Sequence, residues 1–388
     1  MIKTLALSNY RSLLNVVLPL AQLNVITGAN GSGKSNIYRA LRLLAETAQG
    51  GVIHALAHEG GLQSSFWAGP ERISSRMRSG EDPVEGGPRT EAQRLRLGFA
   101  TAEFGYAIAF GLPIPNPEPS AFQLDPEIKH ECIWAESFYR PARSLVERKG
   151  AVIKIREQRS WTIISQRLHF FDSMFDQATN PSATPDIFYM RETIRSWRFY
   201  DHFRSDKDAP ARQAQLGTRT PVLSHDGRDL AAALQTILEI GDADALSHAI
   251  DDAFPGARLE IETHGDTRFS INFYQYGLLR PLSGAELSDG TLRYILWIAA
   301  LLTPRPPLLM VLNEPETSLH PDLLPALARL IINASKHTQI IVVSHANRLI
   351  NALQQDSSCH LIALEKVLGQ TEVVGQGMLD EPPWHWPY

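Results

Sequence analysis

The stretch Gly28-Ala29-Asn30-Gly31-Ser32-Gly33-Lys34-Ser35 decides the fold of this chain. It has the spacing G-x-x-x-x-G-K-[ST] of a phosphate-binding loop. The apolar run 23–27 before it predicts a buried strand, and 36–45 after it predicts a helix. Glycines allow backbone turns that other residues avoid, so successive N–H groups can point at phosphate oxygens. A glycine-rich turn with a chance lysine would lack these flanking elements, so we expect this loop to bind a nucleoside triphosphate.

The side chains of the loop predict its chemistry. Lys34 is expected to reach the outer phosphates and Ser35 to hold Mg²⁺, while the start of the helix adds a partial positive charge. The expected nucleotide contacts are Asn30, Gly31, Ser32, Gly33, Lys34, Ser35 and Asn36.

Composition excludes several classes of protein. A chain of 388 residues is long enough for two or three domains. The two cysteines, Cys132 and Cys359, offer neither a disulfide framework nor metal-ligand spacing, which suits a reducing cytoplasm. Residues 1–7 alternate like a strand and lack the apolar core of a signal peptide. The apolar stretch 294–302 is too short to span a bilayer. We expect a cytoplasmic protein without membrane insertion.

Charge is unevenly distributed along the chain. The net charge is −5, yet residues 140–220 hold fifteen Lys or Arg against nine Asp or Glu. This asymmetry suits a basic surface that faces nucleic acid. The alternative is a solvated lobe whose arginines pair locally, and the overall pI of about 6.2 favours it slightly. The local acidic partners would be Glu147, Glu157, Asp201 and Asp206. The candidate DNA-phosphate contacts, near Trp161, are Arg143, Arg148, Lys149, Lys154 and Arg156.

Two later apolar runs end in polar residues. Residues 307–316 predict a buried strand with Glu314 at its carboxyl end, where ligands of open α/β sheets bind. Glu314 would orient or deprotonate the attacking water, although it could also be a helix-capping acid before a proline. The run 340–343 is followed by Ser344 and His345, and a histidine there can bond the γ-phosphate or hold the water. The expected catalytic residues are therefore Glu314, His345 and Lys34.

A third motif precedes these strands. The turn 287–293 feeds a helix, and its residues Ser288, Asp289 and Gly290 form a potential anion site, although many helix caps look similar. The stretch 282–286 is a second candidate for the same motif. We favour Ser288 because Gly290 takes the fourth position and the helix follows directly.

These motifs resemble a known series. The phosphate loop 28–35 resembles the Walker A motif, the turn 287–293 the signature, and the strand 307–316 the Walker B motif. The stretch 317–321 resembles the D-loop, and Ser344 with His345 resembles the H-loop. The chain resembles the ABC-type ATPase head of SMC, RecF and OLD-like proteins, within the bacterial predicted ATPases of the AAA family. The resemblance covers 1–48 and 280–350. It implies an α/β P-loop NTPase of ABC/RecF-like type, with a mixed sheet core, an antiparallel β subdomain and an inserted helical lobe. The opening 7–12 also resembles that group and implies that Arg11 approaches the nucleotide.

This resemblance predicts three segments. Residues 1–139 would form the N-terminal part of the ATPase head and its antiparallel β subdomain. Residues 140–255 would form an inserted, mostly helical lobe, and 256–388 the C-terminal part of the head.

The resemblance also implies a mechanism. ATP and Mg²⁺ would be bound between two copies of the chain, with Ser288, Asp289 and Gly290 of one copy completing the site of the other. Gln63 is either a Mg²⁺-contacting Q-loop residue or a surface glutamine. Asn313 stands where the family usually has an aspartate on the metal's water, so turnover is expected to be slow and Asn313→Asp to raise it. The metal-side residues are therefore Ser35, Asn313 and Gln63.

The leading functional expectation is an ATPase whose ATP-dependent homodimerisation acts on DNA, in repair, chromosome maintenance or phage defence. The alternative is a slow-hydrolysing switch that controls a protein effector in a toxin or defence system. Transporter nucleotide-binding domains are similar too, but their two motif halves usually lie closer together.

Overall fold

The computed structural model describes residues 1–86, 92–114, 121–158, 160–177, 180–201, 203–265, 267–377 and 380–387. The chain divides into two compact units. The first unit comprises Met1–Ala21, Thr27–Trp197 and Ile362–Tyr388, and the second comprises Gln22–Ile26 and Arg198–Leu361.

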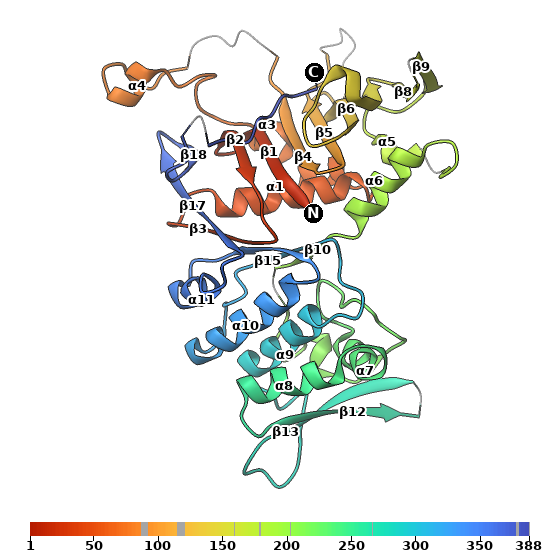
Figure 1. The fold of residues 1–388 in the computed structure, drawn as a ribbon, viewed down its shortest axis with the longest axis vertical. Helices are drawn as coiled ribbons and strands as arrows, with labels where there is room; N and C mark the ends of the chain where they lie inside the picture. Colours follow the sequence, from red (N-terminus) through yellow and green to blue (C-terminus); the bar gives the residue numbers. More distant parts are fainter. Residues whose placement is uncertain are drawn as a thin grey trace. The chain divides into compact units, whose positions relative to one another are not determined.

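The first unit is built on an eight-stranded antiparallel sheet in the order β2-β1-β4-β5-β6-β7-β8-β9 (Figure 1). Its core strands bury alternate large side chains, as β4 does with Leu95, Leu97 and Phe99. The strands are β1 (Ile2–Tyr10), β2 (Leu13–Pro19), β4 (Leu95–Thr101), β5 (Phe104–Gly111), β6 (Glu127–Ala135), β7 (Ser144–Lys149), β8 (Val152–Glu157) and β9 (Ser160–Ser165).

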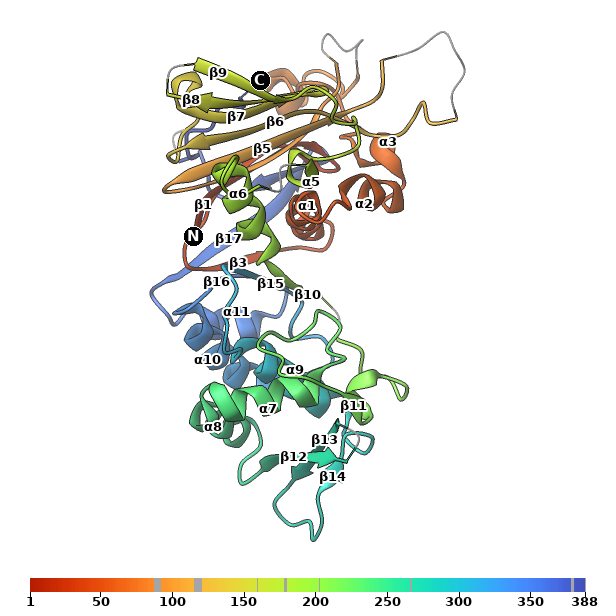
Figure 2. The ribbon, with the colours of Figure 1, turned by 90° about the vertical axis from the view of Figure 1, so that its right-hand side faces the viewer.

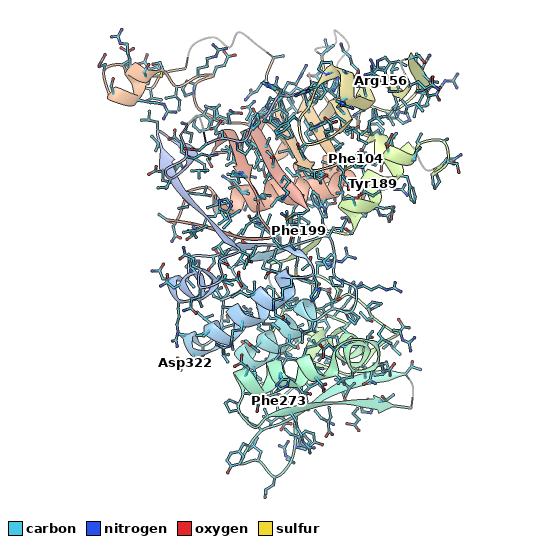
Figure 3. All side chains as sticks on the ribbon, viewed as in Figure 1. Phe104, Arg156, Tyr189, Phe199, Phe273 and Asp322 are labelled. Carbon is cyan, nitrogen blue, oxygen red and sulfur yellow. The ribbon has the colours of Figure 1, made fainter. Side chains whose placement is uncertain are left out.

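Helices lie along one side of this sheet, as Figure 2 shows for α1, α5 and α6. Helix α1 buries an apolar stripe that includes Ile37, Leu41 and Leu44. The rings of Phe104 on β5 and Tyr189 on α6 are 5.2 Å apart and hold that helix to the sheet (Figure 3). The helices are α1 (Lys34–Thr47), α2 (Val52–His58), α3 (Gly61–Ser65), α4 (Ser75–Ser79), α5 (Met174–Gln177) and α6 (Pro185–Arg195).

The second unit has a parallel sheet at its core. Strands β10 (Arg198–Tyr200), β15 (Leu309–Asn313), β16 (Gln339–Val343) and the start of β3 (Leu23–Gly28) pair in that order. β15 and β16 are apolar almost throughout because both faces of the sheet are covered. The helices of this unit are α7 (Leu230–Ile240), α8 (Ala243–Ala253), α9 (Asp289–Leu301), α10 (Leu324–Ser335) and α11 (Asn347–Leu353).

Smaller elements complete both units. A second sheet of the second unit pairs β13 with β12, β11 and β14. In the first unit, β17 and β18 form an antiparallel hairpin, and β17 begins in the second unit. The strands are β11 (Gln215–Leu216), β12 (Arg258–His264), β13 (Arg268–Tyr274), β14 (Leu282–Ser283), β17 (Cys359–Val367) and β18 (Gln370–Val373).

The expected segment boundaries differ from these units. The boundary at 140 falls between β6 and β7, which are neighbours in the eight-stranded sheet. Residues 140–255 therefore contribute three strands to that sheet, and α7 and α8 belong to the second unit. Strands β7, β8 and β9 continue from β6 as a series of antiparallel pairs between consecutive strands, so the sheet extends past the expected boundary.

Candidate functional site

The phosphate loop leads from β3 into α1 as the sequence predicts. Gly31 and Gly33 have φ of 81° and 109°, in the region that favours glycine. The Lys34 side chain is buried, and its Nζ donates to the carbonyl oxygens of Gly28 and Ala29, at 2.7 and 3.1 Å. Ser35 is exposed in the first turn of the helix. The loop therefore presents backbone N–H groups, an ammonium group and a hydroxyl group at one helix N-terminus.

Residues far away in the sequence support this loop. Thr371 Oγ1 donates to the carbonyl oxygen of Ser32 at 2.8 Å and lies 2.7 Å from Ser12 Oγ. Ser12 Oγ in turn accepts from Asn36 Nδ2 at 2.8 Å. A Cβ added to Gly33 would lie 2.0 Å from Thr371 Oγ1, so only glycine fits there. Strand β18 thus fixes the conformation of the phosphate loop.

Two further residues proposed for the nucleotide side lie in the first unit. Arg11 has a φ of 50°, and its Nη2 pairs with Glu59 Oε2 at 3.1 Å. The same carboxylate oxygen accepts from Tyr10 OH at 2.6 Å, and burial together with Glu59 raises the pKa of Tyr10. Gln63 is exposed on the short helix α3. Arg11 is therefore oriented by Glu59, while Gln63 has a solvent-exposed position.

The carboxyl edge of the parallel sheet gathers the second set of candidates. The N–H of Glu314 donates to Val343 O at 2.8 Å, and its carbonyl accepts from Thr317 N at 3.0 Å. These bonds hold Glu314 at a φ of 48°, a strained conformation for a residue with a side chain. His345 Nδ1 lies 3.7 Å from Glu314 Oε1. The structure therefore brings Glu314 and His345 together, as expected from two neighbouring parallel strands.

A buried carboxylate that the sequence analysis missed holds this edge together. Glu316 Oε1 accepts from Ser344 Oγ at 2.7 Å and from the N–H groups of His345 and Ala346, at 3.1 and 3.3 Å. Its side chain is only 7% exposed. Its position two residues after Glu314 was visible in the sequence, but nothing local indicates that it would turn inward.

Asn313 contacts the residue that follows the neighbouring strand. Its Nδ2 donates to Asp201 Oδ1 at 2.7 Å. Asp201 follows β10, whose Tyr200 lies opposite Leu312 in the parallel register. The sequence suggested a local arginine partner for Asp201, and the structure instead gives it Asn313.

The signature turn begins α9. Ser288 caps the helix by accepting from Thr291 N at 3.2 Å, and its side chain is exposed. Buried Arg212 donates to Asp289 Oδ1 at 2.6 Å and to the carbonyl oxygen of Leu287 at 2.6 Å. The competing candidate stretch 282–286 contains β14 instead of a helix start. The exposed N-terminus of a 13-residue helix is thus present at Ser288 and not at Ser283.

Gly290 has a close backbone neighbour. A Cβ added to it would lie 3.1 Å from the carbonyl oxygen of Ser318, within the D-loop stretch 317–321. Arg293 Nη1 also donates to Thr317 O at 3.1 Å. The signature helix and the D-loop are therefore packed together in the second unit.

The basic candidates divide into two kinds. Arg148 is fully buried and pairs with Glu131 at 3.2 Å, so it cannot contact DNA and that prediction is corrected. Lys149 is exposed, and Arg143 is about half exposed and pairs with Glu136 at 2.9 Å.

Two further candidates lie close to the indole ring of Trp161. Lys154 Nζ and Arg156 Cζ lie 4.5 and 5.8 Å from the centre of the Trp161 ring, and Lys154 also pairs with Glu147 at 2.7 Å. Local pairing, the alternative interpretation, thus describes several of these cations.

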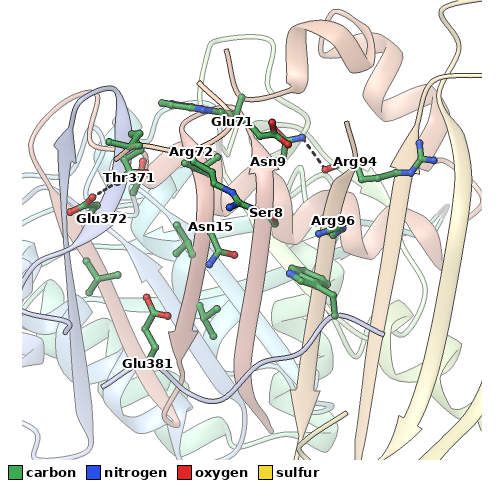
Figure 4. A pocket seen from close by; sticks show the side chains of 18 of the residues that line it. Ser8, Asn9, Asn15, Glu71, Arg72, Arg94, Arg96, Thr371, Glu372 and Glu381 are labelled. Atoms are coloured by element: carbon green, nitrogen blue, oxygen red, sulfur yellow. Dashed lines mark hydrogen bonds between the residues drawn. The ribbon is translucent and has the colours of Figure 1, made fainter. Parts of the chain in front are cut away.

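A cavity of about 1050 Å³ lies in the first unit (Figure 4). Its wall includes Arg72, Arg94 and Arg96, and burial together with Arg96 lowers the pKa of Arg94. Asn9 Nδ2 donates to Arg94 O at 3.0 Å. Thr371 also lines this cavity, so the residue that supports the phosphate loop forms part of its wall.

The described part of the chain lacks both a membrane-spanning helix and a cluster of metal-ligating side chains. No described helix is both long and apolar enough to cross a membrane. Within the same residues, no group of three or more His, Cys, Asp or Glu side chains is arranged as a metal cage. Mg²⁺ bound with a nucleotide uses one or two protein oxygens together with phosphates and water, so it needs no such cage.

Solved structures of SMC heads are similar to this chain. The chain resembles "Crystal structure of the SmcHead bound to the C-winged helix domain of ScpA" with a TM-score of 0.51 and 15% identity, covering 97% of this chain and 98% of that one. It also matches "SMC head domain from Thermotoga maritima" at a TM-score of 0.45 and 15% identity, covering 97% and 99%. A Pyrococcus furiosus Smc head with an extended coiled coil, bound to the C-terminal domain of ScpA, matches at 0.48 and 16%, covering 96% and 95%. At 15% identity, the likeness to the SmcHead structure shows the fold alone.

Sequence comparison identifies the family. No curated protein matches the chain. The family model described as "AAA domain, putative AbiEii toxin, Type IV TA system" matches residues 23–351, which include both the phosphate loop and the Glu314–His345 edge. The chain therefore belongs to this AAA ATPase family, and its fold is that of an ABC-type, SMC-like ATPase head.

Proposed function

We propose that this chain binds and hydrolyses Mg·ATP, and that its phosphate loop and its Glu314–His345 edge act on one nucleotide. The observation that carries the proposal is the path of β3. Its residue Ile26 lies opposite Val343 and accepts a hydrogen bond from Ser344 N at 3.1 Å. The phosphate loop begins only two residues later, at Gly28. The chain that carries Lys34 thus leaves the sheet beside the strand that carries His345.

The chemistry of the donor set fits the nucleotide. Lys34 Nζ is held by carbonyl oxygens, which leave its positive charge for phosphate oxygens. The start of α1 favours anions, and the exposed Ser35 hydroxyl is a hard oxygen ligand suited to Mg²⁺. When bound, Mg²⁺ neutralises charge on the phosphates.

The Glu314 carboxylate would accept a proton from, or orient, the attacking water. His345, 3.7 Å away, would donate to the same water or to a phosphate oxygen. Because Glu316 binds the backbone of both His345 and Ala346, the imidazole is attached to the loop that carries Glu314.

Turnover and nucleotide affinity test this assignment. Lys34→Ala is expected to weaken ATP binding, and Glu314→Gln to keep binding but lose turnover. Matched controls are Lys336→Ala, an exposed lysine that bonds Asn333, and Glu239→Gln, an exposed acid paired with Arg219. Normal turnover in Glu314→Gln would remove this residue from the mechanism.

ATP binding is proposed to close a homodimer in which the α9 start of each copy meets the other copy's nucleotide. The exposed Ser288 at the start of α9 supports this, since a helix N-terminus at the surface favours anions. Ser288→Arg should abolish ATP-dependent dimer mass in light scattering, while Ser247→Arg, exposed on α8, should not. A Ser288→Arg protein that dimerises and turns over normally refutes this arrangement.

We propose that this ATPase acts on DNA. The support is the exposed Lys149 together with Lys154 and Arg156 at the Trp161 ring, all in the first unit. Binding should weaken steeply with salt if phosphates are contacted. Absence of affinity at low salt, with and without ATP, would remove DNA from the proposal.

A protein effector is the second candidate. It is favoured by the family description, which names a toxin of a type IV toxin–antitoxin system, and by the neutral amide of Asn313 at the site. Single-turnover kinetics separate the two. Very slow hydrolysis that DNA does not stimulate supports the switch, whereas stimulation by DNA supports the first candidate.

A further inference from the structure

The carboxyl ends of β10 and β15 lie side by side in the second unit. Tyr200 is opposite Leu312, so the next residue on each chain, Asp201 and Asn313, reaches the same edge of the sheet. The 2.7 Å hydrogen bond from Asn313 Nδ2 to Asp201 Oδ1 joins them. The acidic side chain of Asp201, 112 residues earlier and just after β10, therefore lies at the end of β15.

This pair differs in chemistry from either residue alone. The amide of Asn313 is neutral, but its NH₂ group is used by Asp201, so its oxygen is free to face another donor or a cation. The Asp201 carboxylate is exposed and accepts only. Together they present an amide oxygen and a carboxylate, the oxygen types that Mg²⁺ and its bound waters prefer.

A second observation at the same edge points to a cation or an ordered donor. Glu316 Oε2 is buried and has no hydrogen-bond partner in the described structure, while its other oxygen takes three. A buried carboxylate oxygen normally requires a donor or an ion. The edge that holds Asn313, Glu314 and Glu316 is thus electrostatically suited to a bound cation.

We propose that Asp201 supplies the negative charge of the Mg²⁺ site that residue 313 does not bring. Asp201 acts as a positioning residue, through Asn313 and through the water shell of the metal. This inference rests on the proposed Mg·ATP function. It also changes the expectation for Asn313→Asp: two carboxylates would then stand at hydrogen-bond distance and repel each other, so that change alone brings no gain.

Metal affinity tests the proposal directly. The full chain is saturated with a non-hydrolysable ATP analogue and titrated with Mn²⁺, whose free aquo ion is measured by electron paramagnetic resonance. Binding of a fluorescent ATP without metal is measured in parallel, together with the thermal unfolding midpoint. The variants are Asp201→Asn, Asn313→Asp, the double exchange of both, and the control Asp252→Asn. Asp252 is an acid of the second unit that pairs with Arg329 at 2.7 Å.

Asp201→Asn is expected to weaken Mn²⁺ binding about tenfold or more, the usual effect of losing an outer-shell partner. Its metal-free nucleotide affinity and its unfolding midpoint should match those of the original protein. The double exchange, which returns one carboxylate to the pair, should restore Mn²⁺ affinity to within about threefold, and Asp252→Asn should leave it unchanged.

Two results would overturn the inference: Mn²⁺ affinity of Asp201→Asn within about twofold of the original, or a double exchange no better than Asp201→Asn. Failure of the proposed function has a different signature. In that case the original protein and Lys34→Ala both lack affinity for the nucleotide.

Discussion

Arg148 offers the most direct test of the packing. In the β6–β7 register it lies opposite Glu131, and both side chains are fully buried. Its Nε and Nη2 donate to the carbonyl oxygens of Gly150 and His169, at 2.9 and 3.0 Å. Glu131 also accepts from the hydroxyl groups of Tyr106 and Ser173 and from the Met174 N–H. Arg148→Met keeps much of the side-chain volume but leaves the Glu131 charge buried without its partner.

The magnitude follows from that uncompensated charge. Removing one partner of a buried ion pair costs about 3–5 kcal/mol of unfolding free energy. At about 2–4 °C per kcal/mol for a unit of this size, the midpoint of unfolding should fall by roughly 10 °C. Arg143→Met is the matched control, because its pair with Glu136 is about half exposed and should contribute less than about 1 kcal/mol.

Urea and thermal unfolding, followed by circular dichroism, measure both effects. Adding Glu131→Gln to Arg148→Met removes the stranded charge and should recover about 1 kcal/mol or more. A loss below about 1 kcal/mol in Arg148→Met, or DNA affinity that falls while stability is unchanged, would refute the structural role.

Three other predictions concern a histidine, the support of the phosphate loop and the two cysteines. Burial lowers the pKa of His130 to about 4. The imidazole therefore stays neutral in the folded protein at a pH where the unfolded chain, with a pKa near 6.5, is protonated. The free energy of unfolding that this residue contributes is lost as the pH falls from about 6.5 toward 4. In urea titrations, His130→Gln should reduce that loss by up to about 3 kcal/mol. Identical pH profiles of the two proteins would contradict this. Thr371→Val should weaken ATP affinity by about 1–2 kcal/mol because the carbonyl oxygen of Ser32 loses its donor. Thr371→Ser keeps a hydroxyl group and should bind ATP normally. Equal ATP affinities of Thr371→Val and the original protein would exclude the support role. Burial raises the pKa of Cys132 to about 12 and of Cys359 to about 11, so both should react with iodoacetamide at pH 8 only in urea; rapid labelling of the native protein contradicts this.

Local pattern predicted the elements that carry the site. The apolar run before Gly28 and the periodicity after Lys34 specify β3 and α1 without reference to the rest of the chain. The meeting of Glu314 with His345 also followed, because parallel strands end at one edge of a sheet.

Other parts of the site depend on contacts that no local pattern encodes. β10 has only three residues, too short for a period to show, and its pairing with β15 brings Asp201 to Asn313. Arg148 looked like a surface cation because the residue opposite it, Glu131, is set by sheet register rather than by sequence spacing. Thr371 stands at the far end of the chain from the loop it supports.

The hydrogen bonds of Glu316 have a mechanical consequence. One carboxylate oxygen of Glu316 joins the residues after β16 to the turn after β15. The backbone segments that carry Glu314 and His345 are therefore linked by hydrogen bonds. A displacement of the turn that carries Glu314 should therefore also shift the backbone N–H groups of His345 and Ala346, which an isotope label on these two amides would report.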